Sequence, residues 1–174
     1  MSRSVYLAGP DVFYPDAQAR GVAMQAVCQA MGWVGLYPLD AALPANPPSL
    51  SRAIYEANRN LIDRADAVVA NLRDFRGAEP DSGTVWEVAY ALARGKPVVG
   101  YLPDDRTVLA RMGDRQRGGV DAEGCVVEDF GLPLNLMLAH SLHAVVVGSE
   151  PDHQGLRAAL AALAVLPPVP PPGA

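Results

Sequence analysis

Two carboxylates, Asp81 and Glu87, lie six residues apart in a segment that reads Asp-Ser-Gly-Thr-Val-Trp-Glu. Gly83 indicates a turn, and a helical pattern follows it, so the two carboxylates are expected to lie across the start of a helix. Two carboxylates that converge on one crevice are a common arrangement for sugar chemistry. In that chemistry a glutamate can attack an anomeric carbon and hold the sugar as a glycosyl ester. Glu87 is therefore a candidate nucleophile.

Glu87 also has a purely structural interpretation. Thr84-x-x-Glu87 is a capping box, in which Glu87 would only accept a hydrogen bond from the backbone N–H of Thr84. The apolar residues of this helix form one stripe, made of Val85, Val88, Ala89 and Leu92. At about 100° per residue, Glu87 lies nearly opposite that stripe, so periodicity alone predicts an exposed cap. The location of the first helical turn, over the crevice, favours the catalytic interpretation instead.

A second group of candidates follows the first predicted strand, in the segment Tyr-Leu-Ala-Gly-Pro-Asp-Val-Phe. Gly9 allows a backbone turn that a side chain would obstruct. Tyr6, Asp11 and Phe13 could then point at the crevice, where a tyrosine hydroxyl can orient a carboxylate and an aromatic ring offers a stacking face. The alternative is that Tyr6 and Phe13 are buried and packed under the loop.

Three further polar or flexible side chains are weaker candidates. Asn135 and Met137 follow Pro133 and could sit at a site or at a subunit contact, although a methionine is more often part of the core. Asn58 lies in a predicted helix, where an exposed asparagine is the simpler interpretation.

The elements that must position these residues alternate between strand and helix. Apolar runs predict strands over residues 5–8, 33–37, 66–72, 97–102 and 144–148. Helical patterns cover residues 16–31, 51–64, 84–94, 134–142 and 154–165, and residues 104–130 suggest only a short helix and a long loop. This alternation is typical of an α/β fold, a three-layer sandwich in which helices cover both faces of a five-stranded, mostly parallel sheet. Ligands of such folds bind beyond the carboxyl ends of the strands.

The boundaries of the fold also follow from the pattern. Residues 1–165 are predicted to form a single domain, and the proline-rich residues 166–174 a disordered tail. The helix over 16–31 is expected to bury the stripe made of Ala19, Val22, Ala23, Ala26, Val27 and Ala30.

Composition excludes several other classes of function. The formal net charge of −5 gives no basic face for nucleic acid, and the arginines at 106, 111, 115 and 117, mixed with aspartates, are expected to form a solvated loop. Two cysteines and three histidines complete neither a disulfide framework nor a metal site. There is no Gly-x-Gly-x-x-Gly and no P-loop motif. Without a signal peptide or a membrane-spanning run, a cytoplasmic protein is expected.

Taken in order, these segments resemble the nucleoside 2-deoxyribosyltransferase family. The matching stretches are Tyr6-Leu7-Ala8-Gly9-Pro10, residues 61–70, residues 81–98 and Asn135-Leu136-Met137. The specific one is residues 81–98, which read Asp-Ser-Gly-Thr-x-x-Glu-Val-x-Tyr-Ala-Leu-Ala-x-Gly-Lys-Pro-Val. The resemblance extends from residue 5 to about residue 148 and favours a catalytic Glu87 over the capping box.

The resemblance implies a role for each candidate. Glu87 would be the nucleophile, Tyr6 would orient its carboxylate, and Asp81 would hold the sugar hydroxyls, chiefly the 5′-OH. Asn135 and Met137 would reach the site of a neighbouring subunit in a homo-oligomer. The resemblance further implies a flavodoxin-like (Rossmann-like) sheet, neither metal nor organic cofactor, and a deoxynucleoside and a free nucleobase as partners.

The sequence departs from the family at one informative position. Many members have an aspartate facing the base where Asn58 aligns, and an asparagine can bond a base but cannot supply a proton as an acid. The acid that assists the leaving base is therefore unassigned, with Asp11 as a weaker candidate, and the preferred base stays open.

Two alternatives to deoxyribosyl transfer also stay open. One is a hydrolase of the N-glycosidic bond of nucleosides or 5′-nucleotides, which would use the same Glu87 with water as acceptor. The other is a nucleotide-binding module without chemistry, in which Glu87 would be only a cap.

Overall fold

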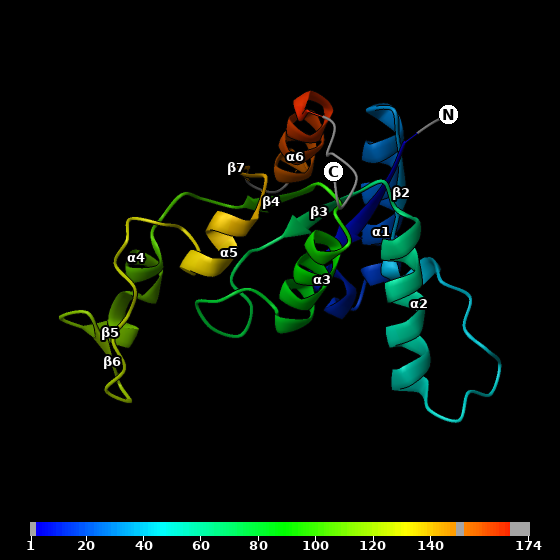
Figure 1. Cartoon of the computed structure of the whole chain (residues 1–174). Helices are drawn as coiled ribbons and strands as arrows, with labels where there is room; N and C mark the ends of the chain where they lie inside the picture. The colour runs from blue at the N-terminus through cyan, green and yellow to red at the C-terminus, as the bar shows by residue number, and fades with distance from the viewer. Residues whose placement is uncertain (1–2, 149–151, 168–174) are drawn as a thin grey trace.

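A single parallel sheet forms the centre of the protein, as the computed structural model shows for residues 3–148 and 152–167 (Figure 1). Its strands are β1 (Arg3–Ala8), β2 (Trp33–Leu36), β3 (Ala67–Asn71), β4 (Val98–Leu102) and β7 (Ala144–Val147). They lie in the order β2-β1-β3-β4-β7, and every neighbouring pair is parallel. The predicted five-stranded α/β sheet is thereby confirmed, in the strand order typical of flavodoxin-like folds.

Helices connect the strands and cover both faces of the sheet. The longer ones are α1 (Ala17–Ala30), α2 (Leu50–Arg64), α3 (Ser82–Ala93), α5 (Leu136–Ser141) and α6 (Gln154–Val165). Two short 3₁₀ helices, η1 (Pro10–Phe13) and η2 (Pro38–Asp40), follow β1 and β2. Within residues 3–148 and 152–167, none of the helices has the length and apolarity needed to cross a membrane. The predicted disordered tail falls largely on residues 168–174, which lie outside the described residues.

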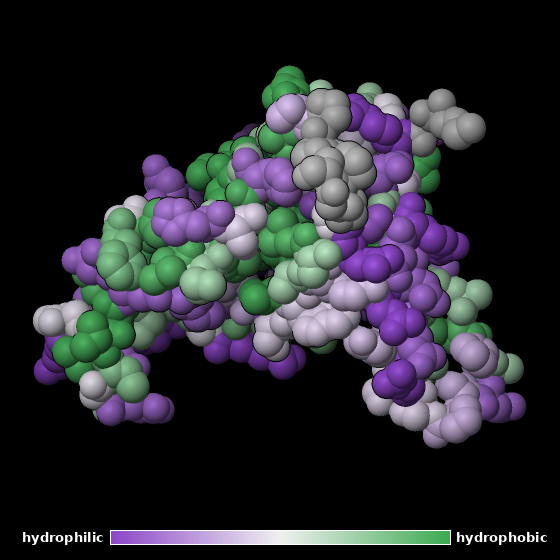
Figure 2. All heavy atoms as spheres, in the orientation of Figure 1, coloured by the Kyte–Doolittle hydropathy of each residue, from purple (hydrophilic) through white to green (hydrophobic). Residues whose placement is uncertain are grey.

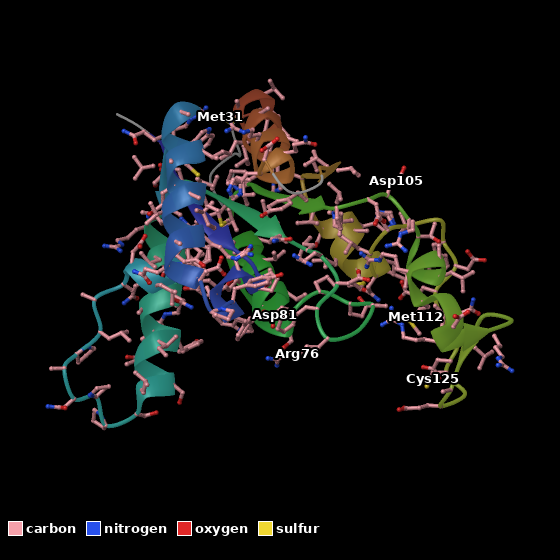
Figure 3. All side chains as sticks on the ribbon, turned by 180° about the vertical axis from the view of Figure 1, so that it is seen from behind. Met31, Arg76, Asp81, Asp105, Met112 and Cys125 are labelled. Carbon is pink, nitrogen blue, oxygen red and sulfur yellow. The ribbon has the colours of Figure 1, made fainter. Side chains whose placement is uncertain are left out.

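Alternate residues of β1 enter two separate cores. Val5 and Leu7 pack with α1 and α6, whereas Tyr6 and Ala8 pack with α2, α3 and α5. Figure 1 views the molecule from the α3 side, and Figure 3, turned by 180°, has α1 in front. Because β1 lies inside the sheet and both of its faces are covered, the side chains of residues 5–8 are all buried. Tyr6 is thus fixed on the side where α3 lies.

The strand order reverses between β1 and β3. From β1 the chain moves to β2 at one edge, then returns across β1 to β3 and continues to β4 and β7. The segments that follow β1 and β3 therefore diverge at the carboxyl edge of the sheet, which is where ligands of doubly wound folds bind.

Residues 104–131 form an arm that stands away from the sheet (Figure 1). It contains α4 (Val108–Met112), η3 (Gly113–Arg115) and a small antiparallel hairpin of β5 (Gln116–Arg117) and β6 (Val120–Asp121). The backbone N–H of Val108 donates to the carbonyl of Leu132 at 2.9 Å and closes the base of the arm. The sequence predicts the short helix here but not the hairpin.

The structure corrects the face that α1 buries. Val22, assigned to the core stripe, is 64 % exposed, whereas Gly21 and Met24 are buried. A Cβ built on Gly21 would lie only 2.4 Å from the ring of Tyr37. Close packing of the Tyr37 ring against Gly21 determines which face of α1 is buried. A count of hydrophobic residues cannot predict this face, because glycine contributes no apolar side chain.

Candidate active site

A hydrogen bond joins β1 to α3 at the carboxyl edge of the sheet. The hydroxyl of Tyr6 donates to Oε1 of Glu87 at 2.6 Å. Tyr6 is fully buried and Glu87 is half-buried, so the bond is largely shielded from water. A charge-assisted O–H···O bond of this length is stronger than a neutral one, and it fixes the direction of the carboxylate. These two candidates, 81 residues apart in the chain, are brought together.

Asp81, rather than Thr84, caps the helix that carries Glu87. Its Oδ2 accepts hydrogen bonds from the backbone N–H of Thr84 at 2.9 Å and from the Thr84 hydroxyl at 3.0 Å. The helix therefore begins at Ser82, two residues before the predicted start, and Glu87 falls in its second turn. The alternative of a capping box does not hold, because Thr84 is inside the helix and the carboxylate of Glu87 accepts a hydrogen bond from Tyr6 instead.

The buried face of α3 differs from the predicted stripe. Thr84, Val88 and Ala91 are buried, and Val88 is the one of them that the stripe included. At about 100° per residue, Glu87 lies roughly 60° from Thr84, at the margin of the buried face. The buried face of α3 is thus turned toward Glu87 relative to the predicted stripe. For this reason Glu87 contacts a tyrosine of the central sheet, although periodicity places it opposite the core.

The environment of Glu87 changes its protonation. Burial raises its pKa from 4.5 to about 7, the hydrogen bond from Tyr6 acts in the lowering direction, and the nearby charge of Asp81 adds to the rise. Burial and the charge of Glu87 also raise the pKa of Tyr6, so the phenol keeps its proton and remains a donor. A carboxylate poised near neutral pH in a crevice is typical of a functional site.

Asp11, in the segment that follows β1, is buried. Its Oδ2 accepts a hydrogen bond from Nδ2 of Asn71 at 2.9 Å, and the guanidinium of Arg20 lies 3.7 Å from Oδ1. A Cβ added to Gly9 would approach Cβ of Asn71 to 2.8 Å, so glycine allows β1 and β3 to end this close together. Because both neighbours of Asp11 are donors, its position suits a structural acceptor better than an acid for the leaving base.

Phe13 projects from η1 and is 55 % exposed. It stacks on Phe75, which follows β3, with the ring centroids 5.1 Å apart, and the guanidinium of Arg76 lies over both rings. Arg76 and Asp81 lie on the same side of the molecule in Figure 3. Phe75 is not among the candidate site residues predicted from the sequence. Its position in the loop that follows a buried strand is the feature that could have indicated it.

Asn58 lies half-buried in α2, beside a cavity of ≈160 Å³. Val12 of η1 and Leu39 of η2 contribute apolar groups to the same cavity. The structure thus places Asn58 at the same cavity as residues that follow β1 and β2.

Asn135 and Met137 lie on the other side of α3, away from Glu87. They line a mostly apolar cavity of ≈600 Å³ between α3 and α5, together with Val85 and Leu92 of the predicted stripe. Figure 2 shows apolar residues in green over α5 and in the hollow beside α3. Oδ1 of Asn135 caps α5, and Met137 is 73 % exposed. Within one copy of the chain, these two candidates do not join the Tyr6–Glu87 pair.

Within residues 3–148 and 152–167, no group of three or more histidine, cysteine, aspartate or glutamate side chains is arranged to hold a metal ion.

The sheet order and the shielded pair define the class of the protein, an α/β fold with a poised carboxylate at its ligand-binding edge. The family model for nucleoside 2-deoxyribosyltransferases matches residues 5–137. The chain belongs to this family.

Three individual proteins are similar to this chain. An uncharacterized protein of Schizosaccharomyces pombe is 32 % identical, with 76 % of this chain and 74 % of that protein covered. A 2-deoxyribosyltransferase of Leishmania mexicana is 33 % identical, covers 92 % of this chain and 96 % of its own, and superposes with a TM-score of 0.69. A 2-deoxyribosyltransferase of Bacillus psychrosaccharolyticus, 21 % identical with coverage of 82 % and 84 %, shares the fold with a TM-score of 0.54.

The two groups that act on the Glu87 carboxylate, Tyr6 and Asp81, predict how its ionisation responds to substitution. Glu87 is expected to titrate near pH 7, because burial raises its pKa to that value. Tyr6→Phe removes the hydrogen bond that lowers the pKa, so the midpoint moves to higher pH. Asp81→Asn removes a charge that raises the pKa while asparagine still caps the helix, so the midpoint moves to lower pH. A carbon-13 NMR titration of the glutamate carboxylates measures this, and a Glu87 midpoint near 4.5 that neither substitution moves would contradict it.

Proposed function

We propose that the protein transfers 2-deoxyribose from one nucleobase to another through a covalent intermediate on Glu87. The observation that carries the proposal is the shielded Tyr6–Glu87 hydrogen bond of 2.6 Å, in a chain of the nucleoside 2-deoxyribosyltransferase family. A carboxylate whose direction is fixed, at the switch point of a doubly wound sheet, is suited to attack one carbon of a bound sugar.

In the first step an oxygen of Glu87 attacks C1′ of the deoxyribose. The C1′–O bond forms as the bond from C1′ to the base nitrogen breaks, through a transition state with oxocarbenium character. Oε1 is occupied by the Tyr6 hydroxyl, so Oε2 is the oxygen available for attack. The electron pair of the broken bond leaves with the base, which needs a proton or strong hydrogen bonds to depart.

In the second step the nitrogen of an incoming base attacks C1′ from the face that the first base vacated. The ester bond breaks, the carboxylate of Glu87 is restored, and two inversions give overall retention of configuration. Water can compete as the acceptor, so exclusion of water decides between transfer and hydrolysis. Tyr6 stabilises the carboxylate at the start and the end of this cycle, when the charge is present.

Asp81 is proposed to hold the 5′-OH of the sugar. Its Oδ2 is used by the helix cap, which leaves Oδ1 free to accept a hydrogen bond from a hydroxyl. Asn58 and Phe13, from the segments on either side of the crevice, are proposed to contact the base by hydrogen bonding and by stacking. An asparagine supplies no acidic proton, so Asn58 would assist departure of the base only by hydrogen bonding.

The active form is proposed to be a homo-oligomer in which Asn135 and Met137 complete the site of a neighbouring copy. Three features support this. Both residues lie away from Glu87 of their own chain, they border an apolar cavity of ≈600 Å³, and the Met137 side chain is largely exposed. An exposed apolar surface rimmed by polar groups is typical of a protein contact.

Base exchange is the direct test of the proposed function. The protein is incubated with deoxyinosine and adenine, and the products are separated by chromatography. Deoxyadenosine is expected to form together with hypoxanthine, and ribo-inosine should react far more slowly. Hypoxanthine and free deoxyribose with no deoxyadenosine would instead identify a hydrolase, and an intact nucleoside would leave only a binding module.

We expect the covalent sugar on Glu87. A 2-fluoro-arabino nucleoside slows release of the glycosyl ester, so mass spectrometry of a digest should find the adduct on the peptide that contains Glu87. Glu87→Gln should show no adduct and no turnover while keeping its fold, since the substitution leaves the cap at Asp81 in place. An adduct on any other residue would disprove the assignment.

We also expect a nucleoside with a free 5′-OH to be preferred over its 5′-monophosphate. A phosphate beside the carboxylate of Asp81 meets like charge, and two unit charges at 4 Å repel by about 4 kcal/mol at an effective dielectric of 20, or roughly three decades of affinity. The measurement compares kcat/KM for deoxyadenosine and its monophosphate in the wild type and in Asp81→Ser. Serine can still cap the helix but carries no negative charge. The substitution should therefore reduce the ratio of kcat/KM for the nucleoside to kcat/KM for the monophosphate. A wild type that prefers the monophosphate would overturn this role of Asp81.

The proposed assembly predicts the effect of a charge at Met137. Met137→Asp places a carboxylate in an apolar contact, so the oligomer should dissociate and the activity should fall at least tenfold. Val165→Asp, on α6 and 82 % exposed, is the matched control and should change neither. Light scattering coupled to size exclusion gives the mass, and a fully active monomer would exclude shared sites.

A further inference from the structure

Arg111 is a buried cation that the reaction as proposed does not use. It lies in α4 at the base of the arm, and its side chain is only 2 % exposed. The sequence places this arginine in a solvated loop with Arg106, Arg115 and Arg117, and the structure corrects that assignment for Arg111. Among the described residues its Nε has no hydrogen-bond partner, so the partners of its two terminal nitrogens indicate what this buried charge holds in place.

Both of its side-chain partners belong to the 73–80 loop, the segment that connects β3 to Asp81. One terminal nitrogen of Arg111 donates to the carbonyl of Ala78 at 3.0 Å. The other lies 2.9 Å from Oδ1 of Asp74. The planar guanidinium of Arg111 thereby joins the arm to the loop at both Asp74 and Ala78. A planar group with two contacts fixes the orientation of the loop better than a single ammonium charge would.

The opposite side of the same loop contacts the segment after β1. Arg73 donates a hydrogen bond to the hydroxyl of Tyr14 at 3.0 Å, and Phe75 stacks on Phe13. Inside the loop, the N–H of Phe75 donates to the carbonyl of Glu79 at 2.9 Å. The loop is therefore held between the crevice on one side and Arg111 on the other, and its last residue precedes Asp81.

We propose that Arg111 is a positioning residue for substrate binding. Through Asp74 and Ala78 it holds the 73–80 loop in the conformation that places Phe75 and Asp81 at the crevice. The arm then serves the site as a rigid support, without a side chain that touches the substrate. This inference rests on the proposed function only for its kinetic consequence, because the clamp on the loop is a property of the chain itself.

A purely structural role for Arg111 predicts a different kinetic result. Loss of folded protein lowers kcat and leaves KM unchanged, because the molecules that remain folded are normal. Loss of positioning weakens binding of the sugar and base, while the Tyr6–Glu87 pair, carried by β1 and α3, stays intact. The second case raises KM at nearly constant kcat.

The kinetic experiment compares Arg111→Gln, Arg111→Lys and the control Arg106→Gln with the wild type. Arg106 is in the same arm but is exposed, and its guanidinium donates hydrogen bonds to Asp104 instead of to the 73–80 loop. Arg111→Gln should raise KM for the deoxynucleoside by about tenfold with kcat within about twofold. Arg111→Lys keeps the charge beside Asp74 and should recover part of the loss, and Arg106→Gln should match the wild type. A fall in kcat at unchanged KM would overturn the proposal.

Hydrogen exchange gives a second measurement that needs no activity. In Arg111→Gln the amides of the 73–80 loop should exchange at least about tenfold faster, while those of β1 and β3 keep their wild-type rates. Unchanged amide exchange rates in the 73–80 loop would show that Arg111 does not hold the loop, whatever the values of kcat and KM. If the wild type neither transfers nor hydrolyses, the proposed function fails, and the exchange rates still decide whether Arg111 holds the loop.

Discussion

The hydrogen bond between Tyr6 and Glu87 is the constraint on which the rest of the structure depends, because it requires a strand and a helix to meet with an accuracy of tenths of an ångström. Burial of the carboxylate that makes this bond carries a cost in stability. The folded state raises the pKa of Glu87 above its ordinary value, so it favours the protonated carboxyl, and the contribution of this group is lost as pH rises toward 7. At neutral pH the fold therefore holds a partly desolvated charge that the chemistry needs, and the two apolar cores must offset it.

The packing of β1 and α3 in one apolar core holds Tyr6 and Glu87 at the distance that their hydrogen bond requires. Tyr6 lies in a strand covered on both faces, so neither its backbone nor its ring has freedom to move, and Val88 and Ala91 seat α3 in the same core. The cap at Asp81 then sets where the helix begins, and so which turn carries Glu87. The proposed nucleophile thus stands on rigid elements, whereas the groups proposed to recognise the sugar and base stand on segments after β1 and β3. Such a division allows substrate preference to change by loop variation without disturbing the reacting carboxylate.

Sequence reasoning succeeded where one physical signal dominates and failed where two compete. Continuous apolar runs such as residues 66–72 have a single interpretation, and all five predicted strands exist. The start of α3 was misplaced because Asp81 and Thr84 are both good caps and only the fold decides between them. Periodicity placed Glu87 in solvent because it counts apolar residues and cannot register a tyrosine hydroxyl from a strand 81 residues away. The burial of Arg111 was invisible for the same reason, since its partners are a distant carbonyl and carboxylate.

In the proposed reaction an incoming base competes with water, and the outcome depends on which groups close the crevice. The glycosyl ester proposed on Glu87 would survive only if the crevice were closed to bulk solvent, yet a second base would still have to enter. The single chain shields the carboxylate from the sheet side through Tyr6, and it leaves an open apolar cavity and an exposed Met137 on the far side of α3. Closure from the solvent side would then come from a neighbouring copy and from the loop that Arg111 holds. On this reasoning the balance between transfer and hydrolysis is set by the groups that enclose the sugar, while the Tyr6–Glu87 pair serves both reactions equally.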